Sequence, residues 1–200
     1  MKKTVKLLGV VVAVLMFSAI ARADTIVFTT TLTGSQEVPP NASTGIGSAL
    51  VTLDTVANTL TVNVAFAGLV SPTTIAHIHC CAPPGGIAIP ATTVPSFPGF
   101  PVGVTTGTFL QTFDLTLASS YNPAFIAAHG GTVAGAQAAF IAGLLSGQAY
   151  FNIHTSQFPQ GEIRGQLQAI QAIPEPATVL LLSTGIMGIA GALRKRRKRG

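Results

Sequence analysis

Residues 47–66 read "GSALVTLDTVANTLTVNVAF", and this stretch decides the class of fold. Apolar and polar residues alternate through 47–54 and again through 59–66, and β-branched residues are frequent in both runs. A period of two residues is typical of a strand with one buried face. Residues 55–58 separate the two runs, so the sequence predicts a β-hairpin with a short turn.

Further strand patterns lie on both sides of this hairpin. They occupy residues 25–33, 73–80, 106–117, 148–155 and 161–168, and the last two form a closing hairpin around "SQFPQ". The intervening segments 34–45 and 83–101 contain Gly and Pro clusters and are expected to be loops. We expect about seven short, mostly antiparallel strands, and therefore a mostly-β sandwich or Greek-key barrel.

An Ala-rich segment at about 121–146 interrupts the strand patterns. Its apolar residues recur at helical spacing at Val133, Ala136, Phe140, Ile141, Leu144 and Leu145. Pro123 suits the first turn of a helix, and Gly147 suits the position just after a helix end. The sequence therefore predicts one short and one longer helix inserted between strands.

Residues 1–23 have the three parts of a secretory signal peptide. Lysines near the start precede an apolar run at 7–20, and residues 21–23, Ala-Arg-Ala, form a small-x-small cleavage site. We expect export across the inner membrane and a mature chain that begins at Asp24. The alternative is an uncleaved N-terminal anchor.

Residues 171–200 form a second special segment. Pro174, Glu175 and Pro176 are followed by an apolar run at 177–193 and by a basic block at 194–199. The apolar run is at the short end for a transmembrane helix, and its basic end is expected on the cytoplasmic side. Behind a signal peptide and an apolar span, the basic block does not indicate nucleic-acid binding.

The formal net charge of +5 misrepresents the domain between these two ends. Between residues 24 and 172, five carboxylates stand against one cation, Arg164, so the domain has a formal charge of −4. Such a domain has no cluster of positive charge that would bind nucleic acid or anionic lipid. Its length of roughly 150 residues is that of a single domain.

The sequence contains none of the common enzyme motifs. Gly-x-Ser-x-Gly, a P-loop and a dinucleotide-binding fingerprint are all absent. Glu37 adjoins a Pro-Pro loop and Glu162 lies two residues from Arg164, so surface or ion-pair roles are expected for these carboxylates. We therefore expect a protein that is not an enzyme, unless a bound metal supplies redox chemistry.

Histidines gather in two of the predicted strands. His77 and His79 share one face of the strand at 73–80, and Asn152 and His154 share one face of a later strand, opposite the apolar residues that suit a core. If these strands are neighbours, three imidazoles converge on the outward side and can bind copper or zinc with a position left for water. The alternative is a set of polar surface or hydrogen-bonding groups. His129 is expected at a helix C-terminus, or alternatively as a fourth ligand.

Cys80 and Cys81 follow the His-x-His pair directly and are the only cysteines in the chain. An oxidising compartment does not preserve free thiols, so we favour a vicinal disulfide between them. Pairing with other chains and thiolate ligation of a metal are the alternatives. The chain has no Cys-x-x-Cys, so a thioredoxin-like role is not indicated.

The C-terminal segment resembles a PEP-CTERM sorting signal of Gram-negative bacteria. The resemblance covers the Pro174-Glu175-Pro176 motif, the apolar span and the basic end. It implies recognition and cleavage by an exosortase-type membrane protease, with the span as a temporary anchor. Delivery to the cell surface, the outer envelope or an exopolysaccharide matrix would follow. The alternative is a permanent C-terminal anchor.

Four landmarks, "LTGSQEVPP", "AHIHC", "YFNIHT" and "GEIRGQL", occur in this order. Together they resemble a CHRD domain, a module named from chordin that is also found in bacterial secreted proteins, and we expect this domain at 24–170. The resemblance implies an immunoglobulin-like β-barrel. Its signature positions fall on Glu37, Pro39, Pro40, His77, His79, Asn152, His154, Glu162 and Arg164. The Cys80-Cys81 pair and the long helical insert depart from the pattern.

Two functions of different classes agree with these features. The first is an exported, surface- or matrix-targeted binding or structural module that interacts with exopolysaccharide or envelope components. The second is an extracytoplasmic copper- or zinc-binding protein that uses His77, His79 and His154. A weaker resemblance to Cu/Zn superoxide dismutase, another β-barrel with a His-x-His strand, favours the metal. A third and weaker hypothesis is an oxidative device based on Cys80 and Cys81.

Overall fold

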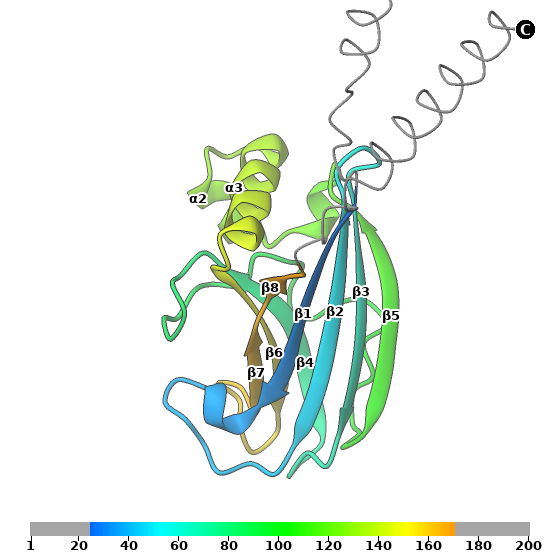
Figure 1. Cartoon of the computed structure of the whole chain (residues 1–200), viewed down its shortest axis with the longest axis vertical. Helices are drawn as coiled ribbons and strands as arrows, with labels where there is room; N and C mark the ends of the chain where they lie inside the picture. The colour runs from blue at the N-terminus through cyan, green and yellow to red at the C-terminus, as the bar shows by residue number, and fades with distance from the viewer. Residues whose placement is uncertain (1–24, 171–200) are drawn as a thin grey trace, which may run out of the picture. The chain divides into compact units, whose positions relative to one another are not determined.

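The computed structural model describes residues 25–170, and their strands form one curled antiparallel sheet (Figure 1). The strands are β1 (Thr25–Thr33), β2 (Ile46–Asp54), β3 (Thr59–Ala67), β4 (Thr73–Cys80), β5 (Gly107–Asp114), β6 (Ala149–Thr155), β7 (Ile163–Gln166) and β8 (Gln168–Ala169). Their order across the sheet is β4-β6-β7-β1-β2-β3-β5, and the short β8 pairs with β1. The predicted mostly-β, antiparallel fold is confirmed, and its sheet is a half-barrel.

The hairpin of β2 and β3 is present as predicted. The two strands pair along their whole length, and buried residues alternate with exposed ones in both. Val51 and Val62 are fully buried and lie directly opposite each other. In the turn, Asn58 has a φ of 56°, a conformation that asparagine adopts more readily than most residues.

The strand predicted at 106–117 is shorter in the structure, because β5 ends at Asp114. Asp114 Oδ1 accepts hydrogen bonds from the backbone N–H of Thr116 at 2.8 Å and from its hydroxyl at 2.6 Å. A single 3-10 turn, η2 (Ala118–Ser120), follows. The side-chain turn at Asp114 therefore directs the chain away from the sheet and toward the helices.

The predicted short and long helices are α2 (Pro123–Ala128) and α3 (Val133–Leu145). Asn122 and Thr132 cap them, since each side-chain oxygen accepts a hydrogen bond from a backbone N–H in the first turn. Gly147 has a φ of 67°, which is a typical conformation beyond a helix end. The helices pack beside each other on one side of the domain (Figure 1).

A long loop, residues 81–106, covers the outer edge of β4. The backbone N–H groups of Ala91 and Thr92 donate to the Ile78 carbonyl oxygen, which satisfies an edge that would otherwise be unpaired. The Phe97 ring lies 5.9 Å from the Phe151 ring in β6 and 5.7 Å from the Phe109 ring in β5. The loop therefore also joins the two ends of the open sheet through the hydrophobic core.

Several features expected from the sequence lie outside the described residues. These are the signal peptide at 1–23 and, in the C-terminal segment, the motif at 174–176, the apolar run at 177–193 and the basic end at 194–199. Within residues 25–170, neither helix has the length and apolarity needed to cross a membrane.

Candidate metal centre

The sheet formed by β4, β6 and β7 has one apolar and one polar face. Ile78, Phe151 and Ile153 are fully buried in the core, as the sequence predicted for that face. On the other face, Asn152 lies opposite His77 of β4 and opposite Arg164 of β7. Strand pairing thus places a row of polar side chains across three strands.

His77, His79 and His154 converge on this polar face. Their ring centroids are 5.0–5.9 Å apart, and one nitrogen from each ring lies within 4.8 Å of the corresponding nitrogens of the others. All three side chains are buried, with 3%, 8% and 6% of their surface exposed. They lie on the face turned away from the apolar core, as the strand pattern predicted, but this face is not open to solvent, because the loop at 81–106 and the β6–β7 connection supply groups that contact them.

Each imidazole donates one N–H to a backbone carbonyl oxygen. The distances are 2.7 Å from His77 Nε2 to Pro95, 2.8 Å from His79 Nδ1 to Ala88, and 3.0 Å from His154 Nδ1 to Pro159. A carbonyl oxygen can only accept, so each bond fixes the tautomer and leaves the other ring nitrogen with a lone pair. Those nitrogens, His77 Nδ1, His79 Nε2 and His154 Nε2, are buried without a partner among the described residues.

Burial also keeps the imidazoles uncharged. Desolvation lowers the pKa of His77 to about 4, and repulsion from His154 acts in the same direction. Desolvation lowers the pKa of His79 to about 3 and lowers the pKa of His154 as well. A neutral imidazole nitrogen is the form that binds a metal ion, so the three lone pairs are available throughout the physiological pH range.

A stack of three side chains supports His79. Its ring lies parallel to the Tyr150 ring at a centroid distance of 4.7 Å, and the Arg164 guanidinium carbon lies 3.5 Å from the centre of the Tyr150 ring. Arg164 also donates a hydrogen bond of 2.6 Å to the Gly86 carbonyl oxygen. The sole arginine of the domain therefore acts as a packing and positioning group next to the histidines.

Glu37 lies beside this site, although the sequence suggested a surface role. The loop that follows η1 (Gly34–Gln36) buries its side chain to 6% exposure, and Asn152 Nδ2 lies 3.5 Å from Glu37 Oε2. Burial raises the pKa of this carboxyl group to about 7, against the opposing effect of Arg164. The expected surface role is therefore wrong, because the loop folds inward over the polar face.

Glu162 is also buried, and its role is structural. Its Oε1 accepts hydrogen bonds of 2.6 Å from the Ser43 hydroxyl and from the Val70 backbone N–H, and its Oε2 accepts one of 2.7 Å from the Thr155 hydroxyl. The carboxylate thus links β6 with two loops. This replaces the surface or ion-pair role that its spacing from Arg164 suggested.

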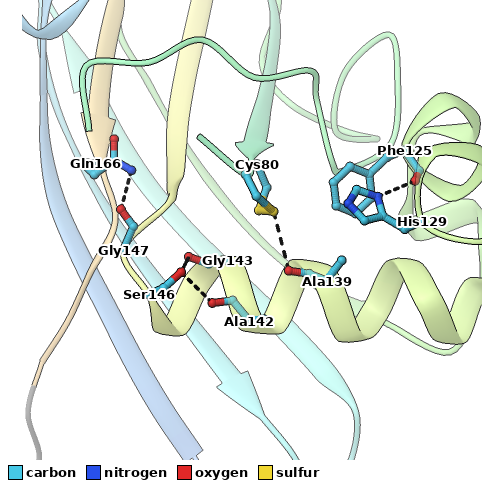
Figure 2. Close-up of a disulfide and its surroundings, with 10 residues drawn as sticks. Cys80, Phe125, His129, Ala139, Ala142, Gly143, Ser146, Gly147 and Gln166 are labelled. Atoms are coloured by element: carbon cyan, nitrogen blue, oxygen red, sulfur yellow. Dashed lines mark hydrogen bonds between the residues drawn. A yellow bond between two sulfur atoms is a disulfide. The ribbon is translucent and has the colours of Figure 1, made fainter. Parts of the chain in front are cut away.

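Cys80 and Cys81 are bonded to each other and pack against α3 (Figure 2). Cys81 Sγ lies 3.6 Å from the Ala139 carbonyl oxygen, and a Cβ atom on Gly143 would overlap Cys80 Sγ.

His129 ends α2, where its Nδ1 donates to the Phe125 carbonyl oxygen at 2.8 Å. It does not belong to the three-histidine cluster, so the structure gives no support to His129 as a fourth ligand.

The fold and the site define a class of protein: a mostly-β domain with a buried three-histidine cluster. The family model of the CHRD domain matches residues 28–167, so the chain belongs to the CHRD domain family. The model of the PEP-CTERM protein-sorting motif matches residues 172–197. This motif marks an exported protein that is sorted by an exosortase-type system. Neither the curated proteins nor the solved structures contain a match to the chain.

Most of the residues in the family signature meet at one place. Asn152 and Arg164 lie on the face that carries the three histidines and Glu37 contacts Asn152, whereas Pro39 and Pro40 belong to the loop that carries Glu37. Sequence reasoning missed the carbonyl oxygens of Ala88, Pro95 and Pro159, because a backbone acceptor has no residue-type signal. Side-chain alternation in "YFNIHT" places Tyr150 on the polar face with Asn152 and His154, but no sequence pattern indicated its stacking on His79.

Proposed function

We propose that this chain is an extracytoplasmic copper- or zinc-binding protein in which His77, His79 and His154 hold the ion. The observation that carries the proposal is the set of three buried imidazole nitrogens, each left with a lone pair by a hydrogen bond on the opposite side of its ring. Imidazoles oriented by carbonyl oxygens in this way are typical of metal sites in proteins. Three such ligands leave one position of a tetrahedral ion for another group.

The exported location agrees with this function. The PEP-CTERM motif directs the chain to an exosortase-type system, and outside the cytoplasm Cys80 and Cys81 stay bonded to each other. We further propose that the apolar run at 177–193 anchors the chain in the membrane until the sorting protease cuts near residues 174–176. The domain is then displayed on the cell surface, in the outer envelope or in an exopolysaccharide matrix.

Elemental analysis tests the metal site directly. Residues 24–172 are exported to an oxidising compartment, offered Cu(II) and Zn(II), and passed through a desalting column. We expect about one ion per chain in the wild type and less than a tenth of that in His77→Ala/His79→Ala, because one imidazole alone does not hold an ion tightly. His129→Ala is the matched control and should retain the wild-type content, since His129 lies outside the cluster.

Absence of both metals from the wild type would contradict the proposal. The histidines would then be structural groups, and the chain would be a displayed binding or structural module without a metal. Equal metal content in the wild type and the double variant would place the ion elsewhere in the chain.

A further inference from the structure

Five buried side-chain atoms lack a hydrogen-bond partner within residues 25–170, and all five belong to one region. They are His77 Nδ1, His79 Nε2, His154 Nε2, Glu37 Oε1 and Asn152 Oδ1. Each of these atoms is an acceptor in the hydrogen-bonding pattern described above. Buried polar atoms in proteins are nearly always satisfied, so five unpaired acceptors in one place indicate a bound cation together with a hydrogen-bond donor.

A metal ion accounts for the three nitrogens but leaves the two oxygens unexplained. Glu37 does not belong to the group of ligand atoms within 4.8 Å of one another, so it is not placed as a fourth protein ligand. Asn152 lies opposite His77 and two residues before His154, on the same face of the sheet as both. Its side chain therefore adjoins the metal position.

The side chains that carry the two unpaired oxygens adjoin the same residue, Gly161. A Cβ atom on Gly161 would lie 2.5 Å from Glu37 Oε1 and 2.6 Å from both Oδ1 and Nδ2 of Asn152, and Nδ2 already donates to Glu37 Oε2. Gly161 itself lies two residues after Pro159, whose carbonyl oxygen accepts the hydrogen bond from His154. The unpaired carboxylate and amide oxygens therefore lie close together, on a residue pair in which Asn152 faces His77 across the strands.

We infer that the fourth position of the ion is a binding site for a small, neutral ligand that donates two hydrogen bonds, with water as the resting ligand. This inference rests on the proposed metal site. Glu37 Oε1 and Asn152 Oδ1 accept the two hydrogens, while the oxygen of the ligand binds the ion. An acceptor-only anion gains no hydrogen bond from the Glu37 carboxylate and meets its negative charge, so the site selects against it.

Two surface grooves reach Glu37. One, of about 380 Å³, is lined by Glu37 and Arg164 among others, and the second, of about 280 Å³, is lined by residues 37–41 and 157–161. Glu37 lines both grooves although only 6% of its surface is exposed. A ligand of the size of water can thus reach Glu37, the residue that we infer receives its hydrogen bond.

Anion binding to the cobalt form tests this selectivity. The exported full-length chain, kept in mild detergent, is loaded with Co(II) and titrated with sodium azide at pH 8.5, where Glu37 is ionised, and the visible absorption of the cobalt is recorded. We expect Glu37→Gln to bind azide at least about tenfold more tightly than the wild type, since the change removes a charge and adds a donor. Asn152→Asp adds a charge and should weaken azide binding by a similar factor.

Asp54→Asn is the matched control. It makes the same charge change in the β2–β3 turn, where the Asp54 side chain accepts hydrogen bonds from the N–H groups of Val56 and Ala57, and it should leave azide affinity unchanged. Equal azide affinity in the wild type and Glu37→Gln overturns the inference while leaving the metal site intact. Failure of the wild type to bind Co(II) overturns the inference and counts against the metal site as well.

A second measurement needs no variant and therefore does not depend on variants that fold. The X-ray absorption spectrum of the wild-type Zn(II) protein should show four light-atom ligands, three of which give the multiple-scattering signal of imidazole. A shell of three imidazoles with no fourth ligand, or a shell of four imidazoles, overturns the inference.

Discussion

The buried histidines and Glu37 have opposite effects on how the folding stability of this domain depends on pH. His77 and His79 are neutral when folded but bind protons below pH 6.5 once the chain unfolds, so the stability that they contribute is lost as the pH falls. Glu37 has a raised pKa in the folded chain, so its contribution is present at low pH and is lost as the pH rises toward 7. The two effects oppose each other between about pH 5 and pH 6.5.

Removal of Glu37 should therefore make the metal-free protein more sensitive to acid. As the pH falls from 6.5 to 5, the two histidines lower the free energy of unfolding by about 3 kcal/mol, and His154 lowers it further. Over the same interval Glu37 raises the free energy of unfolding by about 2 kcal/mol. We expect the free energy of unfolding of Glu37→Gln to fall about 2 kcal/mol more steeply than that of the wild type over this interval. Urea unfolding of both metal-free proteins at the two pH values measures the difference. Parallel pH profiles would mean that Glu37 does not titrate in this range.

At the same scale, the sequence located most of the site but not its burial. His77, His79, Asn152 and His154 could be assigned to one face because side chains alternate along a strand. Nothing in their own strands indicated that the loop at 81–106 would cover them, since coverage depends on contacts between distant segments. No local sequence pattern could show that Glu37 Oε1 lacks a hydrogen-bond partner among the described residues.

At the scale of elements, the sequence predicted strands and helices well wherever a periodic pattern was long. The runs of β2 and β3 alternate over nine residues each, and their hairpin formed as predicted. The error at the end of β5 has a local cause, because the Asp114 side chain competes for the backbone of Thr116. Strand order across the sheet could not be derived, since β1 and β7 pair across more than a hundred residues.

The packing of α3 against the disulfide gives a prediction at this scale. A Cβ atom on Gly143 would overlap Cys80 Sγ and would lie 2.7 Å from Cys81 Sγ. Gly143→Ala within a helix normally stabilises by about 1 kcal/mol, but here we expect a loss of about 1–3 kcal/mol from overpacking. Thermal or urea unfolding of the variant measures the change.

A double-mutant cycle identifies the cause. In a Cys80→Ala/Cys81→Ala background the sulfur atoms are absent, so Gly143→Ala should become neutral or stabilising. A loss of the same size in both backgrounds would show that the sulfur atoms are not responsible. Gly130→Ala is not a suitable control, because the φ of Gly130 is 84° and strain alone would destabilise it.

At the scale of the whole molecule, charge and sorting signals separate the domain from its ends. The basic residues of the chain lie almost entirely outside the domain, which has one arginine and no lysine. The family model of the domain ends at residue 167 and that of the sorting motif begins at 172. The sequence alone could predict this division, because composition changes sharply within a few residues.

Removal of residues 171–200 should therefore change the location of the protein without changing its fold. The described β-sheet ends at Ala169, and every residue of the three-histidine cluster lies before that point. We expect the shortened chain to be exported, to bind metal like the wild type and to appear in the soluble extracytoplasmic fraction instead of the envelope. Cell fractionation with an antibody against the domain, combined with metal analysis of the purified protein, measures both properties.

Replacement of residues 174–176 by alanines is the matched control, because it keeps the apolar run and changes only the motif. This variant should remain in the membrane fraction at its unprocessed mass, since an apolar run anchors a chain independently of any protease. If the shortened chain stayed in the envelope as fully as the wild type, the domain itself would be responsible for binding the protein to the envelope. The grooves beside Glu37 and Arg164 would then be the first surfaces to examine for an envelope partner.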